Sequence, residues 1–291
     1  RADDLQITDD GEILNSQSHG SNNQATLRFF VNDTNTLKFN YERRRSSNVG
    51  SSGLAGANTG VPGLTGVFNG FFPFSNRDRF SARYDIAAVN KYLQLVTAKA
   101  FYQTQYRNFT NILTVPSAPP YFPGLYQRSE TITDTKTSGF DVQTNWLFGS
   151  HSIIAGTSYF LDDNSDRRMT ITSSTSYSPN RTTRYTRSVP DASLSNIGFF
   201  VQDDYLVTER LRLTGGFRFD QFRTTAQPTT NFAVDPRLTP AQIQQLGITG
   251  LDQGLNVKNS AYTGDLGVVY TLTPNVNLSA RIGRSFRTPN I

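Results

Sequence analysis

Residues 210–220 read Arg-Leu-Arg-Leu-Thr-Gly-Gly-Phe-Arg-Phe-Asp, and two kinds of side chain alternate along them. In an extended chain successive side chains point to opposite faces. One face therefore carries the apolar residues Leu211, Leu213, Phe217 and Phe219, and the other carries Arg210, Arg212, Thr214, Arg218 and Asp220. This period of two predicts a β-strand with one apolar and one polar face.

The same alternation recurs along most of the chain. It is clear in residues 36–43, 79–88, 139–148 and 275–283, and weaker in 24–32, 91–106, 151–162, 193–206 and 260–272. Together with 210–220 these segments predict ten strands. We interpret residues 24–291 as one unit built from them, and residues 1–23 as a lead-in or an incomplete strand.

The connections between the predicted strands alternate in length. Tight connections rich in turn-forming residues are expected at 32–35, 89–90, 149–150, 207–209 and 273–274. Long connections are expected at 46–76, 107–134, 163–191 and 223–259, the last with a short helix at 240–246 that Thr239 would cap. Short periplasmic turns alternating with long extracellular loops are typical of outer-membrane β-barrels.

The amino-acid composition of the chain fits strands of which only one face contacts lipid. Only 36% of residues are hydrophobic, yet the chain contains 21 Phe and 13 Tyr. No run of about 18 apolar residues occurs, so no transmembrane helix is predicted, whereas barrel strands are short and alternating. We predict an all-β fold: an antiparallel transmembrane β-barrel segment of about ten strands, surrounded by outer-membrane lipid and located in a bacterial outer membrane.

The aromatic residues divide by height along the predicted strands. Tyr92, Trp146, Phe148, Tyr205 and Tyr270 lie close to the tight connections. Towards the long connections lie Tyr41, Phe80, Tyr102, Phe140, Tyr159 and Phe219. Two aromatic belts at the membrane interfaces would give this distribution, although aromatic residues also favour strands in general.

Basic residues occupy many positions opposite the apolar ones: Arg28, Lys38, Arg79, Arg83, Arg210, Arg212, Arg218 and Arg281. In lipid each would cost about 2–4 kcal/mol at the midplane, so they must face a wet or plugged lumen. They would form ion pairs with lumen acids such as Asp85, Asp141, Asp220 and Asp265 or with a plug. Alternatively, they would form an electrostatic funnel for an anionic ligand.

Several chemistries find no support in the sequence. There is no Cys, so thiol nucleophiles and Cys-based metal sites are excluded. The two His residues, His19 and His151, stand alone, and no His/Asp/Glu cluster has metal-ligand spacing. The net charge of +5 is small and dispersed, which argues against nucleic acid as a partner. We therefore predict no catalytic residue, no metal site, no cofactor and no enzymatic activity.

Three passages resemble TonB-dependent outer-membrane receptors. Residues 280–290 resemble the family's strand that ends in a Phe-Arg-Ala-Pro box, with Phe286, Arg287, Pro289 and Asn290 as motif residues and Thr288 at the Ala position. Residues 198–204 with 211–220 resemble the hairpin of the family that carries "F-Q-D" and "G-x-R-x-D". Residues 156–160 resemble the strand before it.

The resemblance implies a barrel of about 22 strands with an N-terminal plug, energised through the TonB–ExbB–ExbD complex. The plug and the remaining strands would lie outside this chain, which we expect to be a segment of a longer protein. The implied function is active import of an iron-carrying nutrient, either haem or a ferric siderophore.

Contacts to an aromatic, anionic ligand are expected in the long connections, from Tyr121, Phe122, Tyr126, Tyr177 and Arg184. The alternatives are a passive porin or another barrel without a plug, and an outer-membrane barrel enzyme. A soluble all-β adhesin fits least, because its strands would need aliphatic cores.

Overall fold

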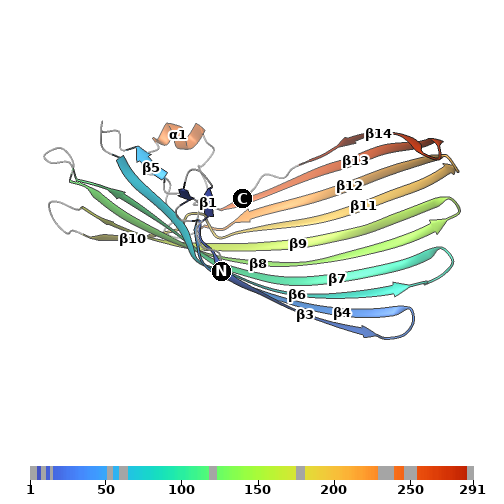
Figure 1. The fold of residues 1–291 in the computed structure, drawn as a ribbon, viewed down its shortest axis with the longest axis horizontal. Coiled ribbons are helices and arrows are strands. Elements are labelled where there is room, and N and C mark those ends of the chain that lie inside the picture. The colour runs from blue at the N-terminus through green and yellow to red at the C-terminus, as the bar shows by residue number, and fades with distance from the viewer. Residues whose placement is uncertain are drawn as a thin grey trace.

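The computed structural model describes residues 5–7, 11–13, 16–50, 55–58, 65–117, 123–174, 181–228, 239–245 and 254–286. Most of them form one long, curved antiparallel sheet that is open between its edge strands β3 and β14 (Figure 1). The path across the sheet runs through β3 (His19–Phe30), β4 (Asn35–Gly50), β6 (Thr65–Ala87), β7 (Leu93–Val115), β8 (Leu125–Phe148), β9 (His151–Ser173), β11 (Ala192–Thr208), β12 (Leu211–Ala226), β13 (Leu255–Thr273) and β14 (Val276–Arg284).

The strands of this path are the ten that the alternation predicts, in the same order, so the all-β antiparallel prediction is confirmed. Two short strands lie beside it: β5 (Ala55–Asn58) pairs with β6, and β10 (Thr182–Thr186) pairs with β9. The lead-in contributes more than expected. Residues 19–23 belong to β3, and β1 (Leu5–Ile7) and β2 (Gly11–Ile13) form a separate hairpin.

Each predicted tight turn is present, and all of them lie at one end of the sheet (Figure 1). In two of them an Asn side chain closes the turn. The Asn32 carboxamide oxygen accepts the backbone N–H groups of Thr34 and Asn35 at 3.0 and 2.8 Å. The Asn90 oxygen accepts those of Tyr92 and Leu93 at 2.8 and 2.9 Å. Gly149 adopts φ +58°, a left-handed conformation that Gly reaches without a steric penalty.

The predicted long connections are wrong in their extent, because β6–β9 continue far into them. The β8–β9 ladder is unbroken from Phe148 opposite His151 to Tyr126 opposite Ser173. Its upper half is polar on both faces: along residues 129–137, Ser and Thr occupy one face, and Glu130, Asp134 and Lys136 lie on the other. The backbone pairing persists there and Thr favours strands, but no apolar face marks the strand in the sequence.

The sheet has two chemically distinct faces. The register places Phe29, Leu37, Tyr84, Ala98, Val142, Thr157, Phe199, Phe219 and Tyr262 in one cross-strand row. We call this side the outer face. Phe29 and Phe217 on it are 51% and 52% exposed, and Leu266 is 67% exposed. Because such a continuous apolar surface is unfavourable in water, the outer face fits contact with lipid.

Aromatic side chains on the outer face form the two predicted belts. Near the turns, Tyr92 stacks on Phe148 at 5.0 Å between ring centroids, and His151 stacks on Tyr205 at 4.0 Å. Towards the opposite end, Tyr41 stacks on Phe80 at 4.6 Å and Phe140 on Tyr159 at 5.6 Å. We call these the turn-side and loop-side belts.

The separation of the belts fits a membrane. Phe148 lies in the turn-side belt and Phe140 in the loop-side belt of the same strand. Eight residue steps at about 3.3 Å give about 26 Å along the strand, or about 20 Å vertically for a tilt of about 40°. This height is close to the apolar band of about 25 Å in outer-membrane barrels.

The predicted short helix is confirmed as α1 (Pro240–Gln245). The Thr239 hydroxyl accepts the Gln242 backbone N–H at 3.3 Å, and the Gln242 side-chain oxygen accepts the Thr239 backbone N–H at 2.9 Å. This reciprocal pair is a capping box. Within the described residues, no helix is both long and apolar enough to cross a membrane.

Candidate functional site

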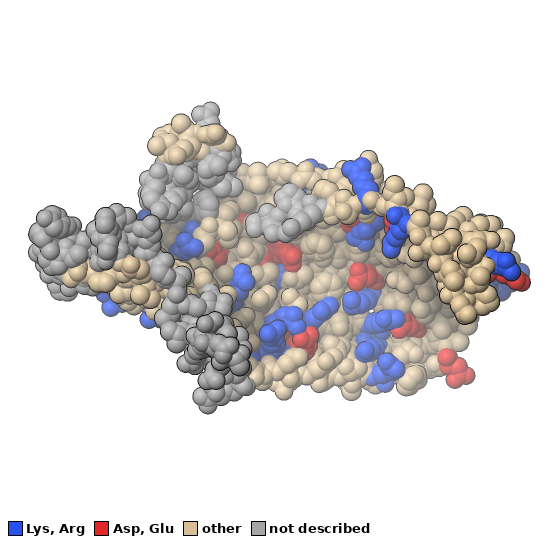
Figure 2. All heavy atoms as spheres, turned by 45° about the horizontal axis from the view of Figure 1, so that its top comes forward, with Lys and Arg blue, Asp and Glu red and all other residues tan. Residues whose placement is uncertain are grey.

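The face opposite the apolar one, which we call the inner face, lines the hollow of the sheet. Figure 2 looks into this hollow and shows Lys and Arg side chains gathered there beside Asp and Glu. The register explains why. One row across the inner face consists of Arg28, Lys38, Arg83, Lys99, Asp141, Ser158, Gly198 and Asp220. The charged residues of the period-two pattern therefore meet on one surface.

The four lumen acids named from the sequence each have a basic partner. Arg83 Nε lies 2.8 Å from Asp85, Arg218 Nη2 2.6 Å from Asp220, and Arg281 Nη2 2.8 Å from Asp265. Lys99 Nζ lies 3.8 Å from Asp141. Arg212 also pairs with Asp204, at 3.3 Å. The interpretation of lumen ion pairs is thereby supported for these residues.

The most fully bonded of these pairs is Arg218–Asp220. Arg218 donates through Nε and Nη2 to both oxygens of Asp220, at 2.7 and 2.6 Å, and also to the Ser158 hydroxyl at 3.0 Å. The Asn196 amide donates to Asp220 at 3.2 Å. These partners on β9 and β11 were not identified from the sequence, because only the strand register brings them together.

Gly198 provides the space for this cluster. It lies directly opposite Asp220, and a Cβ at position 198 would lie 2.5 Å from Asp220 Oδ1 and closer still to Arg218 Nη2. The Gly of the passage 198–204 and the Arg and Asp of "G-x-R-x-D" are therefore one physical unit: an ion pair within β12 and the gap on β11 that accommodates it.

The inner face divides into two parts of opposite charge. We call the inner face of β3, β4, β6 and β7 the basic wall; its cations are Arg28, Lys38, Arg44, Arg77, Arg79, Arg83, Lys99 and Arg107, and its acids are Glu42 and Asp85. We call the inner face of β8, β9, β11 and β12 the acidic wall; its acids are Asp141, Asp162, Asp166, Asp204 and Asp220, and its cations are Arg168, Arg212 and Arg218.

Cations on the basic wall lie next to one another. Lys38 lies directly opposite Arg28 on one side and Arg83 on the other, and Arg83 lies opposite Lys99. Like charges directly opposite in a sheet are destabilising. Phe101 offsets part of this cost, because its ring lies between Arg79 at 5.2 Å and Lys99 at 5.9 Å. The basic wall thus presents surplus positive charge to the lumen.

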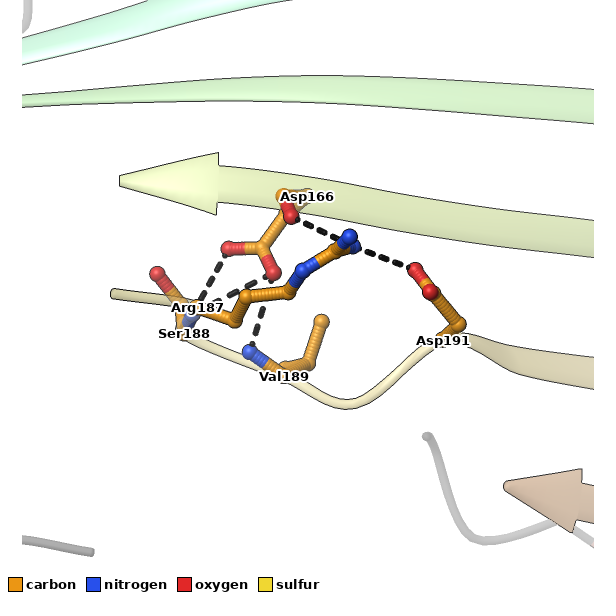
Figure 3. Close-up of polar contacts among 5 residues, drawn as sticks. All are labelled: Asp166, Arg187, Ser188, Val189 and Asp191. Atoms are coloured by element: carbon orange, nitrogen blue, oxygen red, sulfur yellow. Dashed lines mark hydrogen bonds and ion pairs between the residues drawn. The ribbon is translucent and has the colours of Figure 1, made fainter. Parts of the chain in front are cut away.

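Above the loop-side belt, a buried carboxylate fixes the chain between β10 and β11. Asp166 is 4% exposed, and its oxygens accept the backbone N–H groups of Ser188 at 2.9 Å and Val189 at 3.2 Å (Figure 3). Arg187 Nη1 donates to the Asp166 carbonyl at 2.9 Å and to Asp191 at 2.6 Å. This corner holds β10 against the upper end of β9.

The expected ligand contacts fall in different places. Arg184 lies in β10 rather than in a loop, opposite Thr170, on the inner face. Tyr126 also lies in a strand, β8, but shares the register face of Phe140 and so belongs to the outer face. Tyr121, Phe122 and Tyr177 lie outside the described residues. The two described residues, Tyr126 and Arg184, lie on opposite faces of the sheet, and the role of all five as contacts stays a prediction.

Of the motif residues, only Phe286 is described; Arg287, Pro289 and Asn290 lie outside the described residues. The Phe286 ring centroid lies 6.0 Å from that of Phe222 on the inner face of β12. Among the residues that the structure describes, no group of three or more His, Cys, Asp or Glu is placed to hold a metal ion.

The comparisons with known proteins agree with this architecture. Residues 18–291 match the model of the family described as TonB dependent receptor-like, beta-barrel, so the chain belongs to this family of bacterial outer-membrane receptors and transporters. No curated protein sequence matches the chain.

Solved structures with the same fold include a copper transporter, OprC, at a TM-score of 0.66 and 16% identity over 99% of this chain and 40% of that one. The ferric yersiniabactin uptake receptor FyuA from Yersinia pestis matches at 0.56 and 12% identity, over 96% and 39%. The siderophore receptor PiuA from Acinetobacter baumannii matches at 0.50 and 12% identity, over 91% and 46%. The chain thus spans less than half of each of these proteins.

Proposed function

We propose that the protein containing this chain imports an iron-carrying nutrient, haem or a ferric siderophore, across the bacterial outer membrane by TonB-dependent active transport. The family match over residues 18–291 supports import in general. The observation that carries the proposal is the basic wall, where cations outnumber acids and face the lumen. Such a surface attracts an anionic solute and raises its local concentration.

The residues of this chain favour a metal held in an anionic carrier over a bare copper ion. Copper(I) is bound by soft Cys and Met ligands. The chain has no Cys and one Met, and that Met169 lies opposite Glu130 on the outer face, away from the lumen. Iron in a siderophore or in haem already has its ligands, so the wall needs only charge and aromatic surface to receive it.

The ligand contacts proposed from the sequence remain part of this hypothesis. Arg184 is the best placed of them, because it is exposed on the inner face of β10 and the Asp166 corner holds that strand in position. Tyr121, Phe122 and Tyr177 are the aromatic partners proposed with it, whereas Tyr126, also proposed from the sequence, faces away from the lumen. Energy would come from the TonB–ExbB–ExbD complex, which would act on a part of the protein outside this chain.

Growth on defined iron sources tests the proposal. A strain that lacks the gene is supplied with the full-length protein and grown with haem or a ferric siderophore as sole iron source, with and without functional TonB. Growth on one of the two that requires both the protein and TonB is expected. Uptake that continues without TonB would contradict active transport and favour the passive, porin-like alternative. Copper accumulation that depends on the protein, without protein-dependent growth on either iron source, would overturn the proposed cargo.

An outer-membrane barrel enzyme is the other alternative. The described residues place His151 beside Asp203, with 2.6 Å between Nδ1 and Oδ2, but on the outer face near the turns, where lipid rather than a water-filled lumen is the neighbour. No observation on the inner face favours this function over import.

A further inference from the structure

Charged residues also occupy the outer face, in a band just above the loop-side belt. Arg223 on β12 and Lys258 on β13 lie directly opposite each other there. They lie four residues above the belt pair Phe219–Tyr262, which corresponds to about 13 Å along the strand and about 10 Å in height. This is the level at which lipid headgroups surround a membrane protein.

This pair has no counter-charge at the outward positions of β11, β12 and β13 around it. Between the belt and the last pairs Ala192–Ala226–Leu255, the outward positions are Ile197, Ser195 and Ser193 on β11, Gln221, Arg223 and Thr225 on β12, and Ser260, Lys258 and Asn256 on β13. None of them is acidic. Two cations fixed opposite each other repel, and an anion between them removes that cost.

Neighbouring residues hold the cations in position. Arg223 donates through Nε to the Asn256 side-chain oxygen at 3.1 Å, which keeps its guanidinium on the side of Lys258. Below them, Arg284 of β14 lies with its guanidinium carbon 3.9 Å from the centroid of the Tyr262 ring, a cation–π contact at the level of the belt. We call Arg223, Lys258 and Arg284 the outer basic patch.

Other charged positions at this height are balanced. On β8 and β9, Lys136 lies directly opposite Asp163, both on the outer face. On β4 and β6, Arg45 donates to Asp78 at 2.5 Å. Among the described outward residues above the loop-side belt, only the cations of the outer basic patch have no outward carboxylate at their height on the same or the adjacent strand.

From this geometry we infer that the outer basic patch binds the phosphate groups of lipid headgroups in the external leaflet of the membrane. The patch faces away from the lumen, so the anionic ligand of the proposed import is not its partner. Paired basic groups at headgroup height match phosphate in charge, and Arg adds parallel N–H donors for its oxygens. Lipid bound there would anchor the β12–β14 side of the barrel at a fixed depth.

Lipid retention by the purified protein tests this inference. Full-length protein in neutral detergent is incubated with lipid A that carries two phosphates or with lipid A from which the phosphates have been removed, and bound lipid is measured by native mass spectrometry. A third arm adds inorganic phosphate as a competitor. The variants are Arg223→Gln with Lys258→Gln, and Lys136→Gln as the matched control at the same height.

The double variant should retain phosphorylated lipid A about thirtyfold more weakly than wild type, and each single variant about fivefold more weakly. Lys136→Gln should retain it as wild type does, and dephosphorylated lipid A should not distinguish the variants. Equal retention by the double variant and wild type would overturn the inference, as would an equal loss in Lys136→Gln. Complete competition by millimolar inorganic phosphate would also overturn it, because the site would then recognise free phosphate rather than a lipid.

Discussion

The two walls of the inner face differ in how their charges are balanced. On the acidic wall, Asp220 is bound by Arg218 and Asn196, and Asp204 lies beside Arg212, so two cations of this wall are paired with its own acids. On the basic wall, Lys38 lies between Arg28 and Arg83, and Asp85, two residues from Arg83 on the same strand, is bound by Arg83. The central cations of the acidic wall are therefore paired with acids of the same wall, whereas the central cations of the basic wall lie next to one another.

The largest effect is expected from a substitution that adds a methyl group at a tightly packed glycine of the acidic wall. Gly156 on β9 faces Phe200, and an added Cβ would lie 2.7 Å from the Phe200 ring and closer still to the carbonyl oxygen of Val142. Because that oxygen belongs to the backbone, Gly156→Ala should destabilise the protein by about 2–3 kcal/mol. Urea unfolding of the full-length protein in lipid vesicles, followed by tryptophan fluorescence, measures the change.

Gly267→Ala is the control for Gly156→Ala, since its Cβ would make only contacts of 3.8 Å or more. It should stay within about 0.5 kcal/mol of wild type. Equal loss in both variants would show that strand glycines matter for a reason other than close packing.

Removal of the Asp166 carboxylate should have the next largest effect, confined to the corner at 187–191. Asp166→Ala leaves the N–H groups of Ser188 and Val189 without their acceptor, at a cost of about 1–3 kcal/mol. We expect faster proteolysis at this corner, measured by cleavage-site mapping on vesicles. Asp163→Ala, at an exposed position on the same strand, should leave the rate unchanged.

A matched pair of neutral substitutions compares the walls directly. Arg218→Gln leaves Asp220, which is 8% exposed, without its strongest partner and should cost about 1–2 kcal/mol. Lys38→Gln relieves repulsion from Arg28 and Arg83 and should be neutral or slightly stabilising, by up to about 0.5 kcal/mol. If Lys38→Gln were the more damaging of the two in urea unfolding, the proposed surplus on the basic wall would be refuted.

The smallest expected effect is on transport. Arg28→Gln with Lys38→Gln lowers the positive potential of the basic wall, so uptake of an anionic ferric complex should slow by about threefold at low salt. The difference should shrink at physiological ionic strength because of screening. Asp162→Asn on the acidic wall is the control. The comparison is made on initial rates of labelled iron uptake. Identical rates for wild type, the double variant and Asp162→Asn would show that the basic wall does not attract the transported complex.

Much of this architecture could be predicted from the sequence, because the period of two fixes both strands and faces. Segments such as 139–148 and 210–220 revealed strand, lipid face and lumen face together, and Asn32, Asn90 and Gly149 marked the turns. The acids Asp85, Asp141, Asp220 and Asp265 were correctly placed beside basic residues. The named ligand contacts remain untested.

What the sequence did not reveal depends on polar strands and on register. Residues 125–137 and 163–173 are polar on both faces, so no apolar period separates them from loops, although they pair without interruption. The partners Ser158 and Asn196 lie 60 and 24 residues from theirs. The division into two walls likewise needs the order of strands, because each strand alone shows only that its inner positions are polar.

The described strands of this arc end at different heights above the loop-side belt. β9 continues from Tyr159 to Ser173, whereas β12 ends at Ala226, seven residues beyond Phe219. At about 3.3 Å per residue and a tilt of about 40°, one side of this arc rises about 35 Å above the belt and the other about 18 Å. Within the described strands, backbone pairing therefore continues about twice as far above the belt at β9 as at the β12 end of the arc.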